Sequence, residues 1–151
     1  MGDITRSFSR NEFACKCGCG IDDPHPFLVV GLQALRDKAN YPLVITSGCR
    51  CFDHNEAVGG SFGSHHVPDD GRYSRAADCY LVGVGLRLSV ELATMIPVFK
   101  SGGIGVYYDE HGARLHVDVR SGPPARWGKL FGKYVPINDV FMAAEKESDD
   151  V

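Results

Sequence analysis

Hydrophobic and polar residues alternate in several short segments of the chain, a pattern typical of half-buried β-strands. In ARLHVDV at 113–119, Leu115 and Val117 fall on one face of a strand, and His116 and Asp118 fall on the other. The run LVIT is apolar, which favours a short buried strand. We therefore predict strands at 43–46, 75–82, 103–108 and 113–119, the last two joined by a hairpin turn at 109–112.

Helix signals surround these segments. Ser9 with Glu12 fits a capping box, which predicts a short helix from about residue 10. Pro26 suits the first turn of a second helix, which ends at Asn40, and Pro97 ends a third. The predicted helices therefore begin near residues 10 and 26 and cover 87–96 and 138–147, while the Gly-rich stretches at 15–20 and 55–74 are loops.

Helices followed by strands that can pair with one another predict an α+β fold, with a small antiparallel sheet and flanking helices. The chain has no internal repeat and no long linker. We predict a single domain over residues 1–127 and a C-terminal extension with an acidic tail over residues 128–151.

Composition and charge exclude some partners. The 151 residues suffice for a hydrophobic core without disulfides, and the formal net charge of −3 resides in the tail EKESDDV at 145–151. No basic patch suggests a nucleic-acid partner. Neither a secretory signal nor a membrane span is visible in the sequence, so we expect the protein to be made in the cytoplasm and delivered to any outside target by another route.

Three polar elements far apart in the sequence suggest a metal site. SHH at 64–66 lies in a Gly-rich loop, Asp78 follows RAA in a predicted strand, and His116 lies on the polar face of another. A solvated surface explains each element alone. Together, two imidazoles and a carboxylate form the three-ligand set of a catalytic zinc site, in which zinc lowers the pKa of a bound water to about 7 and polarises a carbonyl.

These motifs resemble those of the zinc D-Ala-D-Ala carboxypeptidase and peptidoglycan endopeptidase family, peptidase M15, whose fold is similar to that of Hedgehog domains. The resemblance rests on SHH, RAAD and HVD, and on further segments in the family's order. These are SFSRNEFACKCGCG at 7–20, PLVITSGCR at 42–50, CFDHNEAVGGS at 51–61, GGIGVYY at 102–108 and HVDVRSGPPARW at 116–127. The segment between the first His and the Asp, 67–77, is longer than is usual in the family.

The resemblance assigns roles to individual residues. It implies that His66, Asp78 and His116 bind Zn²⁺ and that Ser64 helps to hold the substrate. His65 stands where relatives often have Gln, which makes it a residue that lines the substrate site and not a ligand.

The catalytic residues implied by the resemblance depart in part from the family pattern. Arg50 matches an arginine that faces the substrate near the metal and pairs with a carboxylate or polarises the carbonyl. Asp118 is expected to orient an imidazole or to share in proton transfer. Many relatives have an acid or His shortly before the last ligand, but Ala113 occupies that position here. Glu110 resembles the Hedgehog-type placement of a glutamate and is the predicted general base.

The six cysteines and the single tryptophan have separate interpretations. Trp127, Cys49 and Cys79 are predicted to be core residues. The other cysteines leave three alternatives open, which are a second, structural zinc site, disulfides or free thiols, although C-x-C-x-C differs from the usual C-x-x-C knuckle. These cysteines are Cys15, Cys17, Cys19 and Cys51.

The resulting functional hypothesis is a zinc metallopeptidase of the D,D-carboxypeptidase or endopeptidase type that hydrolyses a peptide bond in peptidoglycan. A small domain of this kind resembles phage and prophage endolysins and tail proteins, which degrade the cell wall after holin-dependent release or as part of the virion. The first alternative is a non-catalytic, zinc-containing binding module of a virion or wall complex with the same fold. The second is a structural Cys-zinc protein.

Overall fold

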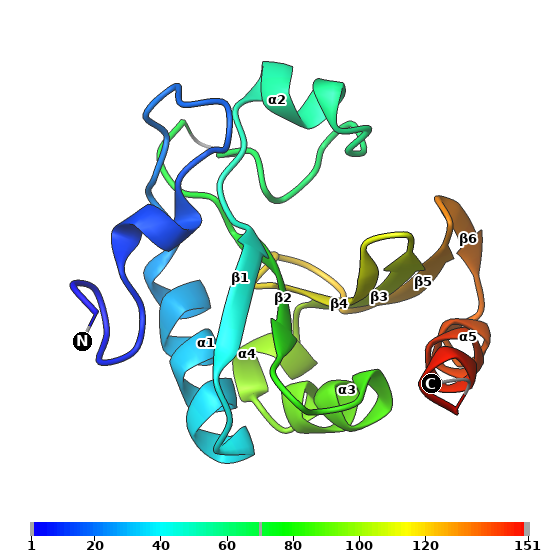
Figure 1. Cartoon of the computed structure of the whole chain (residues 1–151). Coiled ribbons are helices and arrows are strands. Elements are labelled where there is room, and N and C mark those ends of the chain that lie inside the picture. The colour runs from blue at the N-terminus through cyan, green and yellow to red at the C-terminus, as the bar shows by residue number, and fades with distance from the viewer. Residues whose placement is uncertain (1, 70, 150–151) are drawn as a thin grey trace.

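Six strands within the described residues form one sheet in the order β1-β2-β4-β3-β5-β6 (Figure 1). The computed structural model describes residues 2–69 and 71–149. Along the chain the elements are a 3₁₀ helix (Arg10–Phe13), α1 (Pro26–Ala39), β1 (Leu43–Ser47), α2 (Phe52–Ala57), β2 (Ala76–Leu81), α3 (Leu86–Thr94), α4 (Pro97–Lys100), β3 (Gly103–Asp109), β4 (Gly112–Asp118), β5 (Ala125–Leu130), β6 (Lys133–Val135) and α5 (Ile137–Asp149).

The predicted α+β class is confirmed, and the sheet is larger than the sequence suggested. The pairs β1-β2, β2-β4, β3-β4 and β5-β6 are antiparallel, whereas β5 runs parallel to β3. The sheet is therefore mixed, with the predicted antiparallel strands β1 to β4 as its main part. The predicted domain boundary at residue 127 falls within β5.

Helices cover one face of the sheet. In Figure 1, α1, α3 and α4 lie together against the β1-β2-β4 side, and α5 packs against β5 and β3. Because side chains alternate along a strand, Cys79, Ile104, Leu115 and Val117 point to this face and are buried there with the helix leucines. The opposite face of the same strands is left for polar side chains, among them His116.

Most predicted elements agree with the structure, which also contains four elements that were not predicted. The capping box is present, because the Ser9 N–H donates to the Glu12 carboxylate (2.7 Å). The predicted helix at 87–96 corresponds to α3, and Pro97 opens a further short helix, α4, that was not predicted. The polar helix α2 and the strands β5 and β6 were not predicted. Among the described residues, no helix is both long and apolar enough to span a membrane.

Candidate metal centre

The register of the sheet aligns one polar row across its open face. Ser47 of β1 pairs with Asp78 of β2, Asp78 pairs with His116 of β4, His116 pairs with Gly105 of β3, and Gly105 pairs with Trp127 of β5. Directly opposed residues on neighbouring strands have adjacent side chains. The predicted ligands Asp78 and His116 are thus neighbours because of strand pairing alone.

His66 reaches the same place from the loop between α2 and β2. The Arg50 N–H donates to the His66 carbonyl (2.9 Å), and the Arg75 N–H donates to the His65 carbonyl (2.8 Å), so the loop is held on both sides. Ser64 contributes its hydroxyl, which accepts from the His66 N–H (3.3 Å). In the structure Ser64 therefore positions His66.

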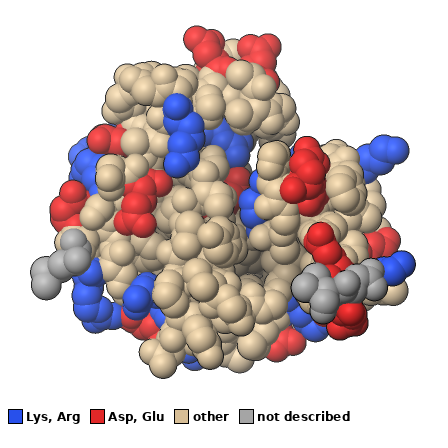
Figure 2. All heavy atoms as spheres, in the orientation of Figure 1, with Lys and Arg blue, Asp and Glu red and all other residues tan. Residues whose placement is uncertain are grey.

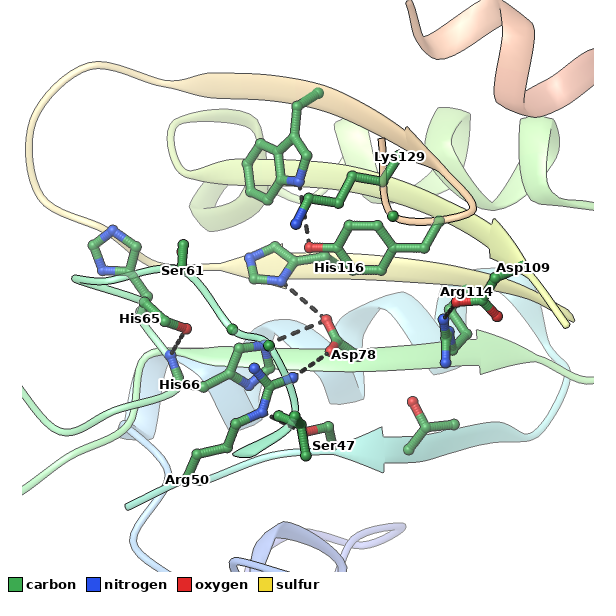
Figure 3. A pocket seen from close by; sticks show the side chains of 18 of the residues that line it. Ser47, Arg50, Ser61, His65, His66, Asp78, Asp109, Arg114, His116 and Lys129 are labelled. Carbon is green, nitrogen blue, oxygen red and sulfur yellow. Dashed lines mark hydrogen bonds and ion pairs between the residues drawn. The ribbon is translucent and has the colours of Figure 1, made fainter. Parts of the chain in front are cut away.

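The outer hydrogen bond of each imidazole determines which ring nitrogen is available to a metal. His66 Nδ1 lies 2.7 Å from the Gly48 carbonyl, and His116 Nε2 lies 2.8 Å from the Asp118 carboxylate. Both partners only accept, so these two nitrogens carry the protons. The other two ring nitrogens, His66 Nε2 and His116 Nδ1, face Asp78 Oδ1 at 3.3 and 3.0 Å, and each would offer its lone pair to a metal bound there (Figure 3).

This geometry fits zinc. Ligand atoms about 2.0–2.1 Å from a tetrahedral zinc lie roughly 3.4 Å from one another. The two measured separations are close to that value, and all three ligand atoms lie within 4.8 Å of one another. The side chains of His66, Asp78 and His116 are buried, which excludes a merely solvated polar face. The set supplies three ligands and leaves a fourth position for water or substrate.

The pKa shifts of the three ligands favour binding of a cation. Burial lowers the pKa of His66. Burial alone would raise the pKa of Asp78, but His66 and His116 hold it well below the usual range. The pKa of His116 is raised because Asp118 and Asp78 outweigh the effect of burial. A metal at this position would therefore take the place of a proton between His116 and Asp78.

Arg50 and His65 complete the surroundings of the ligands. The Arg50 guanidinium donates to Asp78 Oδ2 (3.0 Å), to Ser47 Oγ (3.0 Å) and to Asn55 Oδ1 (3.1 Å). Its main contact is thus the outer oxygen of a ligand. His65 is half-buried beside the centre, and burial lowers its pKa, so it is neutral near pH 7.

Asp118 is fully buried directly behind His116. Its carboxylate accepts from His116 Nε2, from the Gly103 N–H (2.8 Å) and from Arg120 Nε (2.9 Å) and Nη2 (2.7 Å). Burial would raise the pKa of Asp118, but Arg120 and His116 lower it far more, and the group is ionised. Asp118 therefore holds the His116 ring through Nε2, which is the contact that the predicted orienting role requires, and Arg120 is an additional residue that holds Asp118.

Glu110 is not brought together with the ligands. It lies in the β3-β4 turn with its side chain 72% exposed, and its nearest ionic partner is His111 (3.8 Å). The strand β4 begins at Gly112, four residues and about 13 Å of strand before His116, and Glu110 lies beyond that end. Figure 3 shows Asp109 and Arg114, at the same end of the strands, well apart from Asp78. The role of Glu110 as general base stays a prediction.

The centre lies in a cleft of about 1050 Å³. Figure 2 shows the surface hollowed between the part that carries α2 and the part that carries β5 and β6, with charged side chains at depth. Two aromatic residues line the cleft next to His116. The Trp127 ring lies 4.8 Å from the His116 ring, and the Trp127 indole N–H donates to the Tyr107 hydroxyl (3.3 Å).

The prediction that Trp127 is a core residue is wrong, because Trp127 is half-buried in this cleft. Gly105 is the reason, since it leaves the space over β3 that the indole fills. Tyr107 was overlooked although the sequence carries a signal for it. Period two places Tyr107 on the same face of β3 as Gly105, opposite Val106.

Gly105→Ala should displace Trp127. A Cβ at position 105 would lie 2.5 Å from Trp127 Cε2, so the indole must move out of the cleft. We expect the free energy of unfolding to fall by about 1–3 kcal/mol in urea titrations. Because Trp127 is the single tryptophan, its emission should shift to longer wavelength. Gly85→Ala is the matched control, since no atom lies within 4 Å of the added methyl group there. An unshifted emission maximum in Gly105→Ala would contradict the packing described here.

Two imidazoles and a carboxylate that converge in a cleft of an α+β domain are typical of a metal-dependent hydrolase with an open coordination position. The sequence model of one protein family, described as Peptidase M15, matches residues 6–118. The chain therefore belongs to the peptidase M15 family and is a zinc metallopeptidase. No curated protein and no solved structure matches this chain.

Proposed function

We propose that the protein hydrolyses a peptide bond in bacterial peptidoglycan, in a stem peptide or a cross-link that contains a D-amino acid. The observation that carries the proposal is the convergence of His66 Nε2, Asp78 Oδ1 and His116 Nδ1 in an accessible cleft. Family membership supports the substrate class.

The walls of the cleft suit a peptide with free carboxylates. Lys129 and Arg126 of β5 line the cleft on the side of Trp127. The Lys129 ammonium lies 4.6 Å from the centre of the Tyr134 ring, so an aromatic side chain flanks the cation. Carboxylates that do not take part in the reaction would be held by such cations, and Trp127 offers a flat apolar surface.

Residues of the chain divide the catalytic tasks. A bound zinc would supply Lewis acidity that activates water and polarises the scissile carbonyl at neutral pH. Burial raises the pKa of Tyr107, so its hydroxyl stays protonated and can donate to the oxygen on which charge develops. The Arg50 guanidinium neutralises the outer oxygen of Asp78. Its positive charge would also stabilise the substrate oxygen on which negative charge develops.

Two residues compete for the role of general base. Glu110 requires the β3-β4 turn to approach the substrate, because its present position is beyond hydrogen-bond reach of the centre. His65 is neutral and adjacent in sequence to a ligand. Among the described residues that line the cleft, the acids are Asp78, Asp109 and Glu110. This scarcity of acids near the ligands also favours the second function, a non-catalytic binding module.

Digestion of purified peptidoglycan tests the proposal. The wild type should release fragments, identified by mass spectrometry, whose ends name the bond and distinguish carboxypeptidase from endopeptidase action. His66→Ala should release none, because it lacks a ligand. Circular dichroism would confirm that His66→Ala is folded.

Two further variants divide the remaining outcomes. If Glu110 is the base, Glu110→Gln should lower activity by about 10²–10⁴-fold with zinc retained. If His65 is the base, His65→Asn should do so instead. Wild-type protein that binds zinc and releases no fragments would contradict the peptidase and support the binding module.

The biological setting is a further part of the proposal. We propose a phage or prophage enzyme that degrades the cell wall after holin-dependent release or from the virion. The resemblance of the domain to phage and prophage wall-degrading proteins supports this setting.

A further inference from the structure

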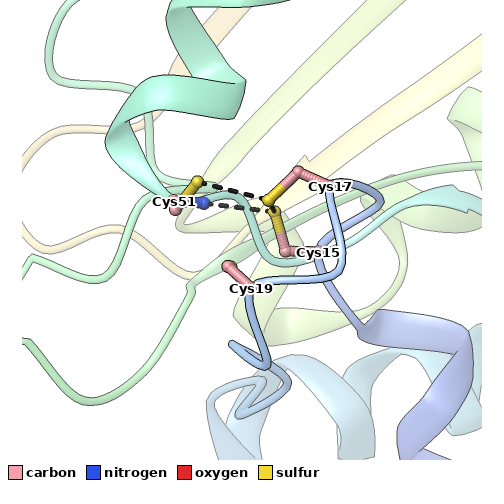
Figure 4. A group of neighbouring side chains, drawn as sticks. All are labelled: Cys15, Cys17, Cys19 and Cys51. Atoms are coloured by element: carbon pink, nitrogen blue, oxygen red, sulfur yellow. Dashed lines mark hydrogen bonds between the residues drawn. The ribbon is translucent and has the colours of Figure 1, made fainter.

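Four of the six cysteines gather at one place outside the catalytic centre. Three come from the loop after the 3₁₀ helix and one from the start of α2 (Figure 4). Their Sγ atoms all lie within 4.8 Å of one another. They are Cys15, Cys17, Cys19 and Cys51.

The sulfur separations fit a metal better than disulfides. Cys15 Sγ and Cys17 Sγ are 3.4 Å apart, and Cys17 Sγ and Cys51 Sγ are 3.6 Å apart. A disulfide bond is about 2.05 Å long. In a tetrahedral zinc site with Zn–S bonds of about 2.3 Å, neighbouring sulfurs are roughly 3.8 Å apart. All six cysteines are free thiols in the structure.

The backbone around the cluster is arranged as a holder for thiolates. The Cys51 N–H points at Cys15 Sγ (3.4 Å), and the His54 N–H points at Cys51 Sγ (3.3 Å). Gly18 has φ of +81°, which lets the chain turn between the close-set cysteines. The Gly18 N–H closes this turn on the Cys15 carbonyl (3.1 Å).

We propose that Cys15, Cys17, Cys19 and Cys51 bind a second, structural zinc ion. Four thiolates complete a tetrahedron and leave no position for substrate, so this site is closed, unlike the three-ligand centre. The C-x-C-x-C spacing that argued against a usual knuckle is accommodated because the fourth ligand comes from a distant segment, Cys51.

The position of the cluster indicates which parts of the protein the second zinc would connect. Cys51 directly follows Arg50, whose guanidinium contacts the catalytic ligand Asp78. The preceding turn is held by the Cys49 N–H, which donates to the Phe13 carbonyl (2.8 Å). A zinc bound here would join the loop at 15–19 to the end of this turn. It thus ties the N-terminal segment to the wall of the catalytic cleft.

Zinc content per chain tests the inference without reference to activity. Protein made with excess zinc under reducing conditions should hold two zinc ions by elemental analysis, and Cys17→Ser or Cys51→Ser should hold one. Cys49→Ala is the matched control, a buried cysteine beside the cluster, and should keep two. Cobalt-substituted wild type should show near-ultraviolet thiolate-to-Co²⁺ charge-transfer absorption that Cys17→Ser lacks.

A second measurement serves if the serine variants do not fold. Titrating the wild type with a mercurial thiol reagent should release one of the two zinc ions. The inference is overturned if the wild type holds one zinc that His116→Ala removes, or if intact mass shows the hydrogen loss of disulfide formation in freshly purified protein. Two zinc ions with no peptidoglycan digestion would contradict only the proposed function.

Discussion

Asp78→Asn will remove the catalytic zinc and will lower the proposed hydrolysis of peptidoglycan at least about 1,000-fold, roughly 4 kcal/mol of transition-state stabilisation. Both metal-facing imidazole nitrogens converge on Asp78 Oδ1. An amide of the same shape carries no charge, so zinc would meet two neutral imidazoles and one weak ligand. The Arg50 guanidinium, 3.0 Å from Oδ2, would then stand beside the metal without a counter-charge and repel it.

The measurement is zinc content together with fragment release, and Trp127 emission reports that the fold is kept. Asp109→Asn is the matched control, because Asp109 is also a cleft carboxylate paired with an arginine, Arg114. It should retain its full zinc content. If Asp78→Asn kept both zinc and hydrolysis, the metal centre would have to lie elsewhere.

The strands could be predicted from local sequence, and so could the strand faces on which Asp78, His116 and Asp118 lie. Alternation along 113–119 is enough to place His116 and Asp118 on one face, and the same rule places Asp78 on the polar face of β2. That β2 and β4 are neighbours, with Asp78 opposite His116, depends on pairing across 38 residues. The resemblance to a known family, and not periodicity, connected these residues to His66.

What could not be predicted depends on contacts between distant segments. The strand β5 pairs with β3 in parallel, and nothing within 125–130 specifies that partner. Trp127 becomes a cleft residue only because Gly105 lies opposite it. The helix α2 has a polar sequence without apolar periodicity, so its residues indicated a loop. Arg120 follows its strand by two residues, and its role depends on the buried carboxylate it meets.

The general base could not be assigned from the sequence for a different reason. Distance along the chain was used there as a guide to distance in space. Glu110 is six residues from His116, a short separation along the chain. An extended strand converts most of that separation into length, which places Glu110 in the turn at the far end of the hairpin. The choice between Glu110 and His65 therefore depends on the distance of each side chain from the metal centre and not on its position in the sequence.

Asp118→Asn will weaken zinc binding by about 10–100-fold and lower the free energy of unfolding by roughly 2–4 kcal/mol. The carboxylate is fully buried and accepts from Gly103, His116 and Arg120 at once. An amide keeps one acceptor oxygen and turns an NH₂ group toward these donors, so at least one of them loses its partner. The Arg120 charge also remains in place without its counter-ion.

The effect on zinc follows from the tautomer of His116. A carboxylate requires the proton on Nε2 and so leaves Nδ1 free to face Asp78. The amide NH₂ can donate to Nε2 and so stabilises the tautomer with its proton on Nδ1, where zinc would bind. Competition with a zinc-sensitive dye measures the affinity, and urea unfolding of metal-free protein measures the stability. Asp37→Asn, which alters an exposed carboxylate on α1 that pairs with Arg6 of the N-terminal segment, should change neither. Lower stability with unchanged zinc affinity would mean that Asp118 supports the fold alone and that another contact orients His116.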